Sequence, residues 1–350
     1  MVFCVRENFF SNFEGGRSRS LSQHKRVLVA QALNVHTELC RFSSVPNNRI
    51  ENLAKVACTA AGAIWGLYWI PLRAVNAAGV NGSWATTLFY LVPLVLLLPI
   101  GVIRWRRIIN AGWPLQFIAI PAALALVLYS NAFLYTDVIR AILLYYLTPI
   151  WSALLARAWL KEPISRSRIV AIGLGILGLL VILNAEQGMP IPKNAGDWMG
   201  LISGLFWALA ANVMRRESAQ NTFDVLVTWF FWAVLFALVL ALLPILDRPK
   251  IPEGGQVIGI LPWFIPVALF LIIPGFYAIA WGVPLLNPGT VGILFMTEIS
   301  VGAISAALLT DEPFGMREIL GVGLITAAGL TEAFTVVLST SFFTRRQSRS

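Results

Sequence analysis

The stretch "LKEPISRSRIVAIGLGILG" (residues 160–178) recurs in altered form as "TDEPFGMREILGVGLITAAG" (residues 310–329). Glu162 and Glu312, each followed by proline, lie 150 positions apart. In both stretches the charged break separates two apolar runs, and the second run is rich in small residues. Self-similarity at this distance indicates a chain built from two related halves.

A second pair of segments agrees with the first. "GAIWGLYWIPLR" (residues 62–73) and "GLFWALAANVMR" (residues 204–215) each contain glycine, then tryptophan three positions later, then arginine eight positions after that. The residues concerned are Gly62, Trp65 and Arg73 in one half, and Gly204, Trp207 and Arg215 in the other. Each segment lies at the start of its half.

The composition indicates whether these halves lie in water or in a lipid bilayer. Of 350 residues, 58% are hydrophobic and 12% charged, whereas charged residues make up about 25% of soluble domains. The apolar runs are long enough for a helix to cross roughly 30 Å of hydrocarbon, and they are continuous rather than alternating as in barrel strands. We therefore predict an all-α integral membrane protein with ten transmembrane helices, near 54–72, 84–103, 112–135, 139–159, 168–184, 197–214, 224–246, 257–281, 288–309 and 318–341.

The spans define the domain organisation. Residues 1–52 contain both histidines, seven Lys/Arg and no spanning run, and we predict a disordered cytoplasmic tail. A transit peptide is the alternative, but four glutamates in this segment argue against it. Residues 53–185 form the first repeat, residues 197–341 the second, and residues 342–350 a basic cytoplasmic tail.

Basic residues predict the orientation, because cytoplasmic loops are enriched in them. With the amino terminus inside, the connections and the carboxyl tail place eleven Lys/Arg on the inner side and six on the outer side. Both termini are therefore predicted to be cytoplasmic, with the protein in the plasma membrane, as in a bacterial inner membrane. Because five spans per half is an odd number, the second half is inverted, which is a recurrent plan for secondary transporters.

Several other classes of function are disfavoured. The formal charge of +9 is scattered over short connections, so we expect no nucleic-acid partner. Three cysteines without a paired spacing, and no histidine beyond residue 36, predict no metal or other cofactor. The match of residues 173–178 to G-x-G-x-x-G lies inside an apolar span, where glycines permit close helix packing instead of dinucleotide binding. An enzyme would need a constellation of reactive groups, which is not found.

The chain resembles the ten-helix proteins of the drug/metabolite transporter superfamily that consist of two EamA-type repeats. The similar blocks are "LLYYLTPIWSALLARAWLKEPISRSRIVAIGLGILGLLVIL" (residues 143–183) and "ILFMTEISVGAISAALLTDEPFGMREILGVGLITAAGL" (residues 293–330). That family often has Glu-Pro in the ninth helix, where this chain has Glu298-Ile299, while Pro149 is retained in the fourth. The resemblance implies a carrier that moves a small organic metabolite, often outward, by alternating access; amino-acid exporters are the nearest members.

Glu298 is the sharpest site candidate. It lies 11 residues before Leu309, about 16 Å from that end of its predicted helix and near mid-bilayer. A carboxylate at this depth is costly and usually faces a partner or a water-filled cavity. It could bind a substrate amine or exchange a proton, or it could hold a neighbouring helix. Glu332, in the tenth span, is a weaker candidate.

The first span offers a second set of candidates. Trp65, Trp69 and Arg73 follow helical spacing with Gly62 and share one predicted face. Aromatic rings bind apolar or cationic groups, and Arg73 could attract a carboxylate; the alternative is anchoring at the membrane surface. Trp207 and Asn212 are the counterparts in the sixth span.

Pro149 removes a backbone donor and frees the carbonyl of Tyr145, which a substrate, a water or a hydroxyl such as that of Thr148 must satisfy. We expect a kink there. Polar tips on apolar bodies suit a small-molecule site, and the candidates of this kind are Tyr129, Ser130, Asn131, Tyr145, Tyr146 and Tyr277. Hydrogen bonds between helices are the alternative role for each.

The combined expectation is a secondary transporter, a probable exporter, of an amino acid or amine, working in the lipid bilayer and able to form a homodimer. A nucleotide-sugar or sugar-phosphate exchanger of the same superfamily is the alternative, and a non-transporting membrane scaffold is the alternative from another class. Phosphate would require Lys/Arg deep in the spans, where this chain has almost none.

Overall fold

The computed structural model describes residues 48–148, 150–151, 154–155, 166–182, 192–217, 219–243, 250–286, 288–312, 314–328 and 330–331. Within these ranges every regular element is helical. The chain divides into two units, Met1–Leu53 and Ala54–Ser350, and of the first only the beginning of α2 is described. The tail, most of residues 1–52, lies outside the described residues.

Where the structure describes them, the helices overlap the expected spans. They are α2 (Asn48–Gly66), α3 (Trp69–Ala77), α4 (Ser83–Asn110), α5 (Gly112–Tyr135), α6 (Val138–Tyr145), α8 (Arg166–Ile182), α9 (Ala195–Arg216), α10 (Thr222–Leu242), α11 (Gly254–Val267), η2 (Ala268–Ile272), α12 (Ile273–Gly282), η3 (Val283–Leu285) and α13 (Pro288–Leu309). Residues 316–328 are also helical. Six helical stretches are long and apolar enough to cross a membrane: Arg49–Ala77, Ser83–Asn110, Gly112–Tyr135, Ala195–Met214, Thr222–Leu242 and Gly254–Leu285.

Two expected spans are interrupted. Span 54–72 breaks at residues 67–68, between α2 and α3, where Ile70 N–H bonds back to Leu67 O at 3.1 Å. Pro71 explains the break, because it lacks the N–H that a regular helix would direct at the Leu67 carbonyl. The continuous helix expected from the sequence over 54–72 is therefore wrong at this point.

The fourth span is interrupted in the same way. The helix α6 ends at Tyr145, the chain turns at residues 146–147, and residues 148 and 150–151 are helical again. Pro149 itself lies outside the described residues. A break at this position agrees with the kink that the missing N–H of Pro149 predicts, and Tyr146 lies in the turn.

A further irregularity lies in the eighth expected span, 257–281. There the helix begins at Gly254 and contains one π-helical turn, η2, closed by Ile273 N–H bonding to Ala268 O. Pro274 follows directly and has no N–H to donate. Such turns re-aim the side chains that follow them, and Phe276 is the next large ring.

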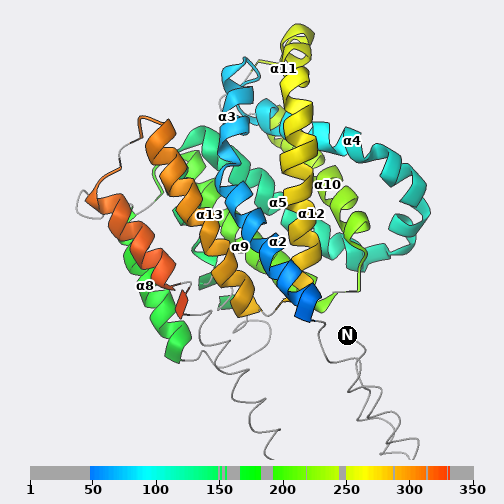
Figure 1. Ribbon diagram of the computed structural model, residues 1–350. Coiled ribbons are helices and arrows are strands. Elements are labelled where there is room, and N and C mark those ends of the chain that lie inside the picture. Colours follow the sequence, from blue (N-terminus) through cyan, green and yellow to red (C-terminus); the bar gives the residue numbers. More distant parts are fainter. Residues whose placement is uncertain are drawn as a thin grey trace, which may run out of the picture. The chain divides into compact units, whose positions relative to one another are not determined.

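Glycines allow three close helix contacts. A Cβ on Gly204 of α9 would lie 2.5 Å from Tyr145 O, and one on Gly66 of α2 would lie 2.8 Å from Gly302 N of α13. A Cβ on Gly178 of α8 would lie 2.7 Å from Ile325 in the helix 316–328. Figure 1 shows both of the latter pairs side by side, α2 (blue) with α13 (orange), and α8 (green) with the last described helix (orange-red).

Candidate functional site

Glu298 lies in the middle of α13 and is 1% exposed. Its two carboxyl oxygens have different tyrosine partners: Tyr129 donates to Oε1 at 2.7 Å, and Tyr146 donates to Oε2 at 2.7 Å. Tyr129 belongs to α5 and Tyr146 directly follows α6. The carboxyl group of the second half is therefore held by two hydroxyl groups of the first half.

Tyr146 has a second acceptor within reach. Its hydroxyl lies 2.7 Å from the carbonyl oxygen of Phe295, one turn before Glu298 on α13. A tyrosine hydroxyl carries one hydrogen, so it donates to one of these oxygens at a time. With Glu298 ionised, the hydrogen serves the carboxylate; with Glu298 protonated, the carboxyl group can donate to Tyr146 while Tyr146 donates to Phe295. The geometry thus satisfies both protonation states.

The backbone around Tyr145 brings these tyrosines into place. The Thr148 hydroxyl donates to Tyr145 O at 2.7 Å, which is one of the partners expected for that carbonyl. Gly204 of α9 also packs against the same carbonyl. The Tyr145 ring stacks on the Tyr129 ring with centroids 4.4 Å apart and planes at 27°. Tyr129, Tyr145 and Glu298 therefore come together as one buried cluster.

Next to this cluster lies a group of rings from four helices, which we call the aromatic box: Trp65 (α2), Trp207 (α9), Trp229 (α10) and Phe276 (α12). The centroid distances are 5.4 Å for Trp65–Trp207, 6.0 Å for Trp207–Trp229, and 5.5 Å from Phe276 to both Trp65 and Trp229. Phe295 of α13 lies 6.3 Å from Trp65. Because Phe295 O also meets Tyr146, the box adjoins the Glu298 cluster.

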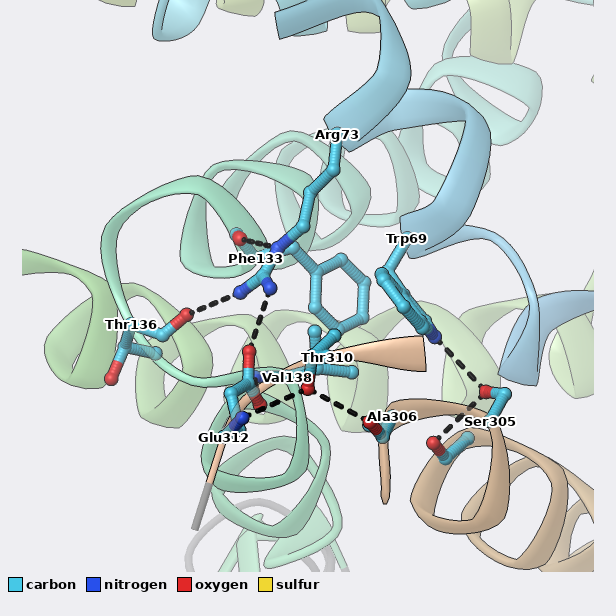
Figure 2. Close-up of polar contacts among 10 residues, drawn as sticks. Trp69, Arg73, Phe133, Thr136, Val138, Ser305, Ala306, Thr310 and Glu312 are labelled. Atoms are coloured by element: carbon cyan, nitrogen blue, oxygen red, sulfur yellow. Dashed lines mark hydrogen bonds and ion pairs between the residues drawn. The ribbon is translucent and has the colours of Figure 1, made fainter. Parts of the chain in front are cut away.

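Gly62, Trp65, Trp69 and Arg73 each contact α13 or the segment after it, although the helix is interrupted between Trp65 and Trp69. Trp69 Nε1 donates to Ser305 Oγ at 3.1 Å. Arg73 Nη1 lies 2.6 Å from Glu312 Oε1. Figure 2 shows this row of contacts between the two halves.

Arg73 was expected to be available for a substrate carboxylate. Figure 2 shows its remaining donors on backbone oxygens, from Nε to Phe133 O at 2.9 Å and from Nη2 to Thr136 O at 3.1 Å. Glu312 in turn accepts from the Val138 N–H at the start of α6 at 2.7 Å. In this conformation Arg73 therefore binds the protein itself.

Three other predicted residues lie away from Glu298's hydrogen bonds. Asn131 is buried between α4 and α5, where it accepts from Ser83 Oγ and donates to Val127 O, each at 2.8 Å. Asn212 donates to Ala208 O in its own helix at 2.8 Å. The Tyr277 ring packs against Phe223 with centroids 5.0 Å apart. Pro149 and Glu332 lie outside the described residues.

Sequence reasoning left out several residues that the structure brings to the site. Trp229 and Phe276 lie in uniformly apolar runs and carry no signal of their own. The ion pairs Arg104–Asp224 (2.6 Å) and Arg140–Asp197 (2.7 Å) were also missed; each joins a charge at one span end to a charge at another. Among the described residues, no group of His, Cys, Asp or Glu could hold a metal ion.

The duplicated organisation decides the family. The model of the EamA-like transporter family matches twice, over residues 53–184 and 194–331. The chain belongs to the EamA-like transporter family. It is thus a multi-pass membrane protein of a transporter family. The Glu298 cluster unites the two matched regions of this EamA-like transporter, because Tyr129 and Tyr146 belong to the first and Glu298 to the second.

Curated relatives of this EamA-like transporter carry names of the same kind. An uncharacterized transporter of Synechocystis sp. is 28% identical over 210 residues, which cover 58% of this chain and 60% of that protein. Uncharacterized transporters of Helicobacter pylori and Clostridium kluyveri are 25% and 21% identical, over 63% and 78% of their lengths. The chain spans 60% and 63% of the lengths of the first two relatives. A solved crystal structure, 13% identical, matches 81% of this chain and 97% of its own with a TM-score of 0.54, which supports the fold.

Proposed function

We propose that this EamA-like transporter is a secondary transporter that exports a small organic metabolite with an amine group, an amino acid or an amine, by alternating access. The observation that carries the proposal is Glu298, a fully buried carboxyl group in the middle of a membrane helix, held by hydroxyl groups of the other half. Such residues in membrane spans mark substrate and ion pathways. An ammonium group is the natural counter-ion for it.

The same hydrogen bonds support the proposal that transport is coupled to protons. When Glu298 is ionised, the Tyr146 hydroxyl can donate a hydrogen bond to its carboxylate. When Glu298 is protonated, the same hydroxyl can accept from the carboxyl group and donate to Phe295 O. The site can therefore exchange a proton for a substrate ammonium without leaving a buried polar group unpaired, which would be costly. This exchange couples outward movement of substrate to inward movement of protons.

The proposed topology is ten helices in two inverted five-helix repeats with both termini cytoplasmic. Three ion pairs between segments far apart in sequence are consistent with it, because each joins groups that the proposed span alternation assigns to the same face. In this topology Arg73–Glu312 and Arg140–Asp197 would lie on the outer face, and Arg104–Asp224 on the inner face. The relatives named above are bacterial, which supports a bacterial inner membrane.

Alternating access requires contacts between the halves to open and close. In this conformation the halves meet along α2–α3 and α13, through Gly66 against Gly302, Trp69 against Ser305, and Arg73 against Glu312. These contacts run from the level of Glu298 towards the proposed outer face. We infer that they separate when the halves rock apart, as in other carriers with inverted repeats.

A sugar-phosphate or nucleotide-sugar exchanger is a poorer fit. Phosphate recognition uses Arg or Lys, and the partly buried guanidinium groups of Arg73, Arg104 and Arg140 are each bonded to a carboxylate. An enzyme or a passive scaffold gives no role to a buried carboxyl group shared between duplicated halves.

A metabolite screen of cells that overproduce the protein would identify compounds that accumulate outside. Uptake into proteoliposomes, with and without a pH gradient, would then test Glu298→Gln. We expect the variant to lose gradient-driven transport, while the control Glu217→Gln, at a half-exposed surface position, keeps it. Unchanged gradient-driven transport in Glu298→Gln would exclude Glu298 from the coupling.

A further inference from the structure

Four buried side-chain polar atoms lack a hydrogen-bond partner within the described part of the chain, and two of them belong to the aromatic box. The two atoms in the box are the indole Nε1 atoms of Trp65 and Trp229. As residues, Trp65 is 3% exposed and Trp229 is 1% exposed. Trp65 comes from α2 in the first half and Trp229 from α10 in the second. Both rings contact Trp207 and Phe276.

An indole N–H can only donate. A buried donor without an acceptor is unfavourable, and native structures nearly always supply one. Two such donors in a single ring cluster therefore favour an acceptor from outside the described residues, such as a bound ligand. Because the donors are neutral, they suit a carbonyl or a single carboxylate better than a phosphate group.

The aromatic box adjoins the buried Glu298 carboxyl group. The Phe295 ring lies 6.3 Å from the Trp65 ring, and the backbone oxygen of Phe295 is bonded to the hydroxyl that also reaches Glu298. On α2, Gly66, the neighbour of Trp65, packs directly against Glu298 O. Trp65 of the box thus contacts Phe295, whose backbone oxygen shares the Tyr146 hydroxyl with the Glu298 carboxyl group.

We propose that Trp65 and Trp229 form an acceptor subsite that binds the carboxylate of a zwitterionic substrate, while Glu298 binds its amine. The proposal rests on the transport function proposed above and restricts its substrate class to apolar amino acids rather than simple amines. The rings of Trp207 and Phe276 would cover the apolar body of the substrate. Charge is balanced, because the zwitterion supplies one positive group to Glu298 and one negative group to two neutral donors.

The competing account is that each indole hydrogen faces a neighbouring ring. Trp65–Trp207 and Trp229–Phe276 are edge-to-face pairs, with interplanar angles of 61° and 72°, and an N–H over a ring is a weak hydrogen bond. In that account the tryptophans serve packing alone. Replacing Trp by Phe separates the two accounts, because phenylalanine keeps a ring and removes the N–H.

The test uses purified full-length protein and three probes with one apolar body. They are L-leucine, 3-methylbutylamine, which lacks the carboxylate, and 4-methylpentanoate, which lacks the amine. Direct binding of radiolabelled leucine, with the other two as competitors, is measured for wild type, Trp65→Phe, Trp229→Phe and the control Trp113→Phe. Trp113 is 69% exposed and lies outside the box.

In wild type we expect leucine to bind more tightly than either competitor. Trp65→Phe and Trp229→Phe should each weaken leucine binding roughly ten-fold, as for loss of a hydrogen bond to a charged group, and should change affinity for the amine less than two-fold. Trp113→Phe should match wild type. Unchanged affinity for the amine also shows that each variant is folded.

Equal weakening of leucine and amine, or no change in either, would overturn the acceptor subsite in favour of packing. Failure of wild type to bind leucine would overturn the assignment to apolar amino acids. If the metabolite screen nevertheless found an exported compound, the transport function would stand without the subsite; if it found none, the transport function itself would fail.

Discussion

The Arg73 guanidinium lies 2.6 Å from the Glu312 carboxylate, across 239 positions of sequence. Glu312 also accepts from the first N–H of α6, so its two oxygens join three segments of the chain (Figure 2). Arg73 is 30% exposed and Glu312 11% at the side chain. This is a partly buried contact between the two matched repeats.

A double-mutant cycle with Arg73→Gln and Glu312→Gln should show coupling of about 1–2 kcal/mol in the free energy of unfolding, since the groups share one hydrogen-bond network. Thermal or denaturant unfolding in detergent would measure it. The same cycle at Arg216 and Glu217, 3.9 Å apart and with Arg216 87% exposed, should give a coupling near zero. Additive effects at Arg73 and Glu312 would contradict the structural role given to the pair.

Tyr146→Phe should impair pH-gradient-driven transport more than Tyr129→Phe. Both hydroxyls bond Glu298, but only that of Tyr146 also reaches Phe295 O and can serve both protonation states. The ratio of transport with and without a gradient in proteoliposomes measures the difference. Tyr277→Phe is the control, because its ring packs against Phe223 away from Glu298's hydrogen bonds. Equal losses in the two tyrosine variants would argue against the proposed switch of donors.

Gly204→Ala should destabilise the protein by roughly 1–3 kcal/mol, the usual cost of overpacking. The new methyl group would lie 2.5 Å from Tyr145 O, which is backbone and has little freedom to move. Gly173→Ala is a matched control in another apolar helix, where the added Cβ meets nothing within 4 Å among the described residues. Unfolding midpoints in detergent would compare the two, and equal midpoints would contradict the close approach of α9 to Tyr145.

Asp197→Asn should cost about 3 kcal/mol or more, because it leaves a partly buried arginine without its counter-charge. Asp197 has no exposed side-chain area and accepts from Arg140 Nε and Nη2 at 2.7 and 2.8 Å, and from Thr136 Oγ1 at 2.7 Å. The double variant Arg140→Met/Asp197→Leu should recover part of the loss. Chemical unfolding would measure the free energy of unfolding of both variants. A double variant less stable than Asp197→Asn would contradict this account.

The sequence was most informative where a polar residue interrupts an apolar run. Glu298, Tyr129 and Tyr145 stood out for that reason, and the structure brings them together. Asn131 stood out equally, yet its side-chain amide forms hydrogen bonds with Ser83 of α4 and with Val127 of its own helix. Residue type thus indicates that a polar partner exists, whereas the rotation of each helix, which sequence leaves open, decides which partner it is.

Helix interruptions were predicted unevenly. Pro149 lies mid-span, and its kink was expected, while Pro71 lies near a span end, and its break was not. The ring partners Trp229 and Phe276 could not be singled out, because uniformly apolar helices carry no periodic signal that distinguishes lipid-facing from inward positions. Their place depends on packing between helices and, for Phe276, on the π-helical turn before it.

The interruption after Tyr145 has a mechanical consequence. Because Pro149 removes the backbone donor, the Tyr145 carbonyl is held by the rotatable hydroxyl of Thr148, at a net worth of about 1 kcal/mol. Gly204 of α9 packs against the same carbonyl, so the neighbouring helix limits bending at residues 146–147. Since Tyr146 lies at this interruption and bonds Glu298, bending of the span there would also move a hydroxyl group that holds the carboxylate.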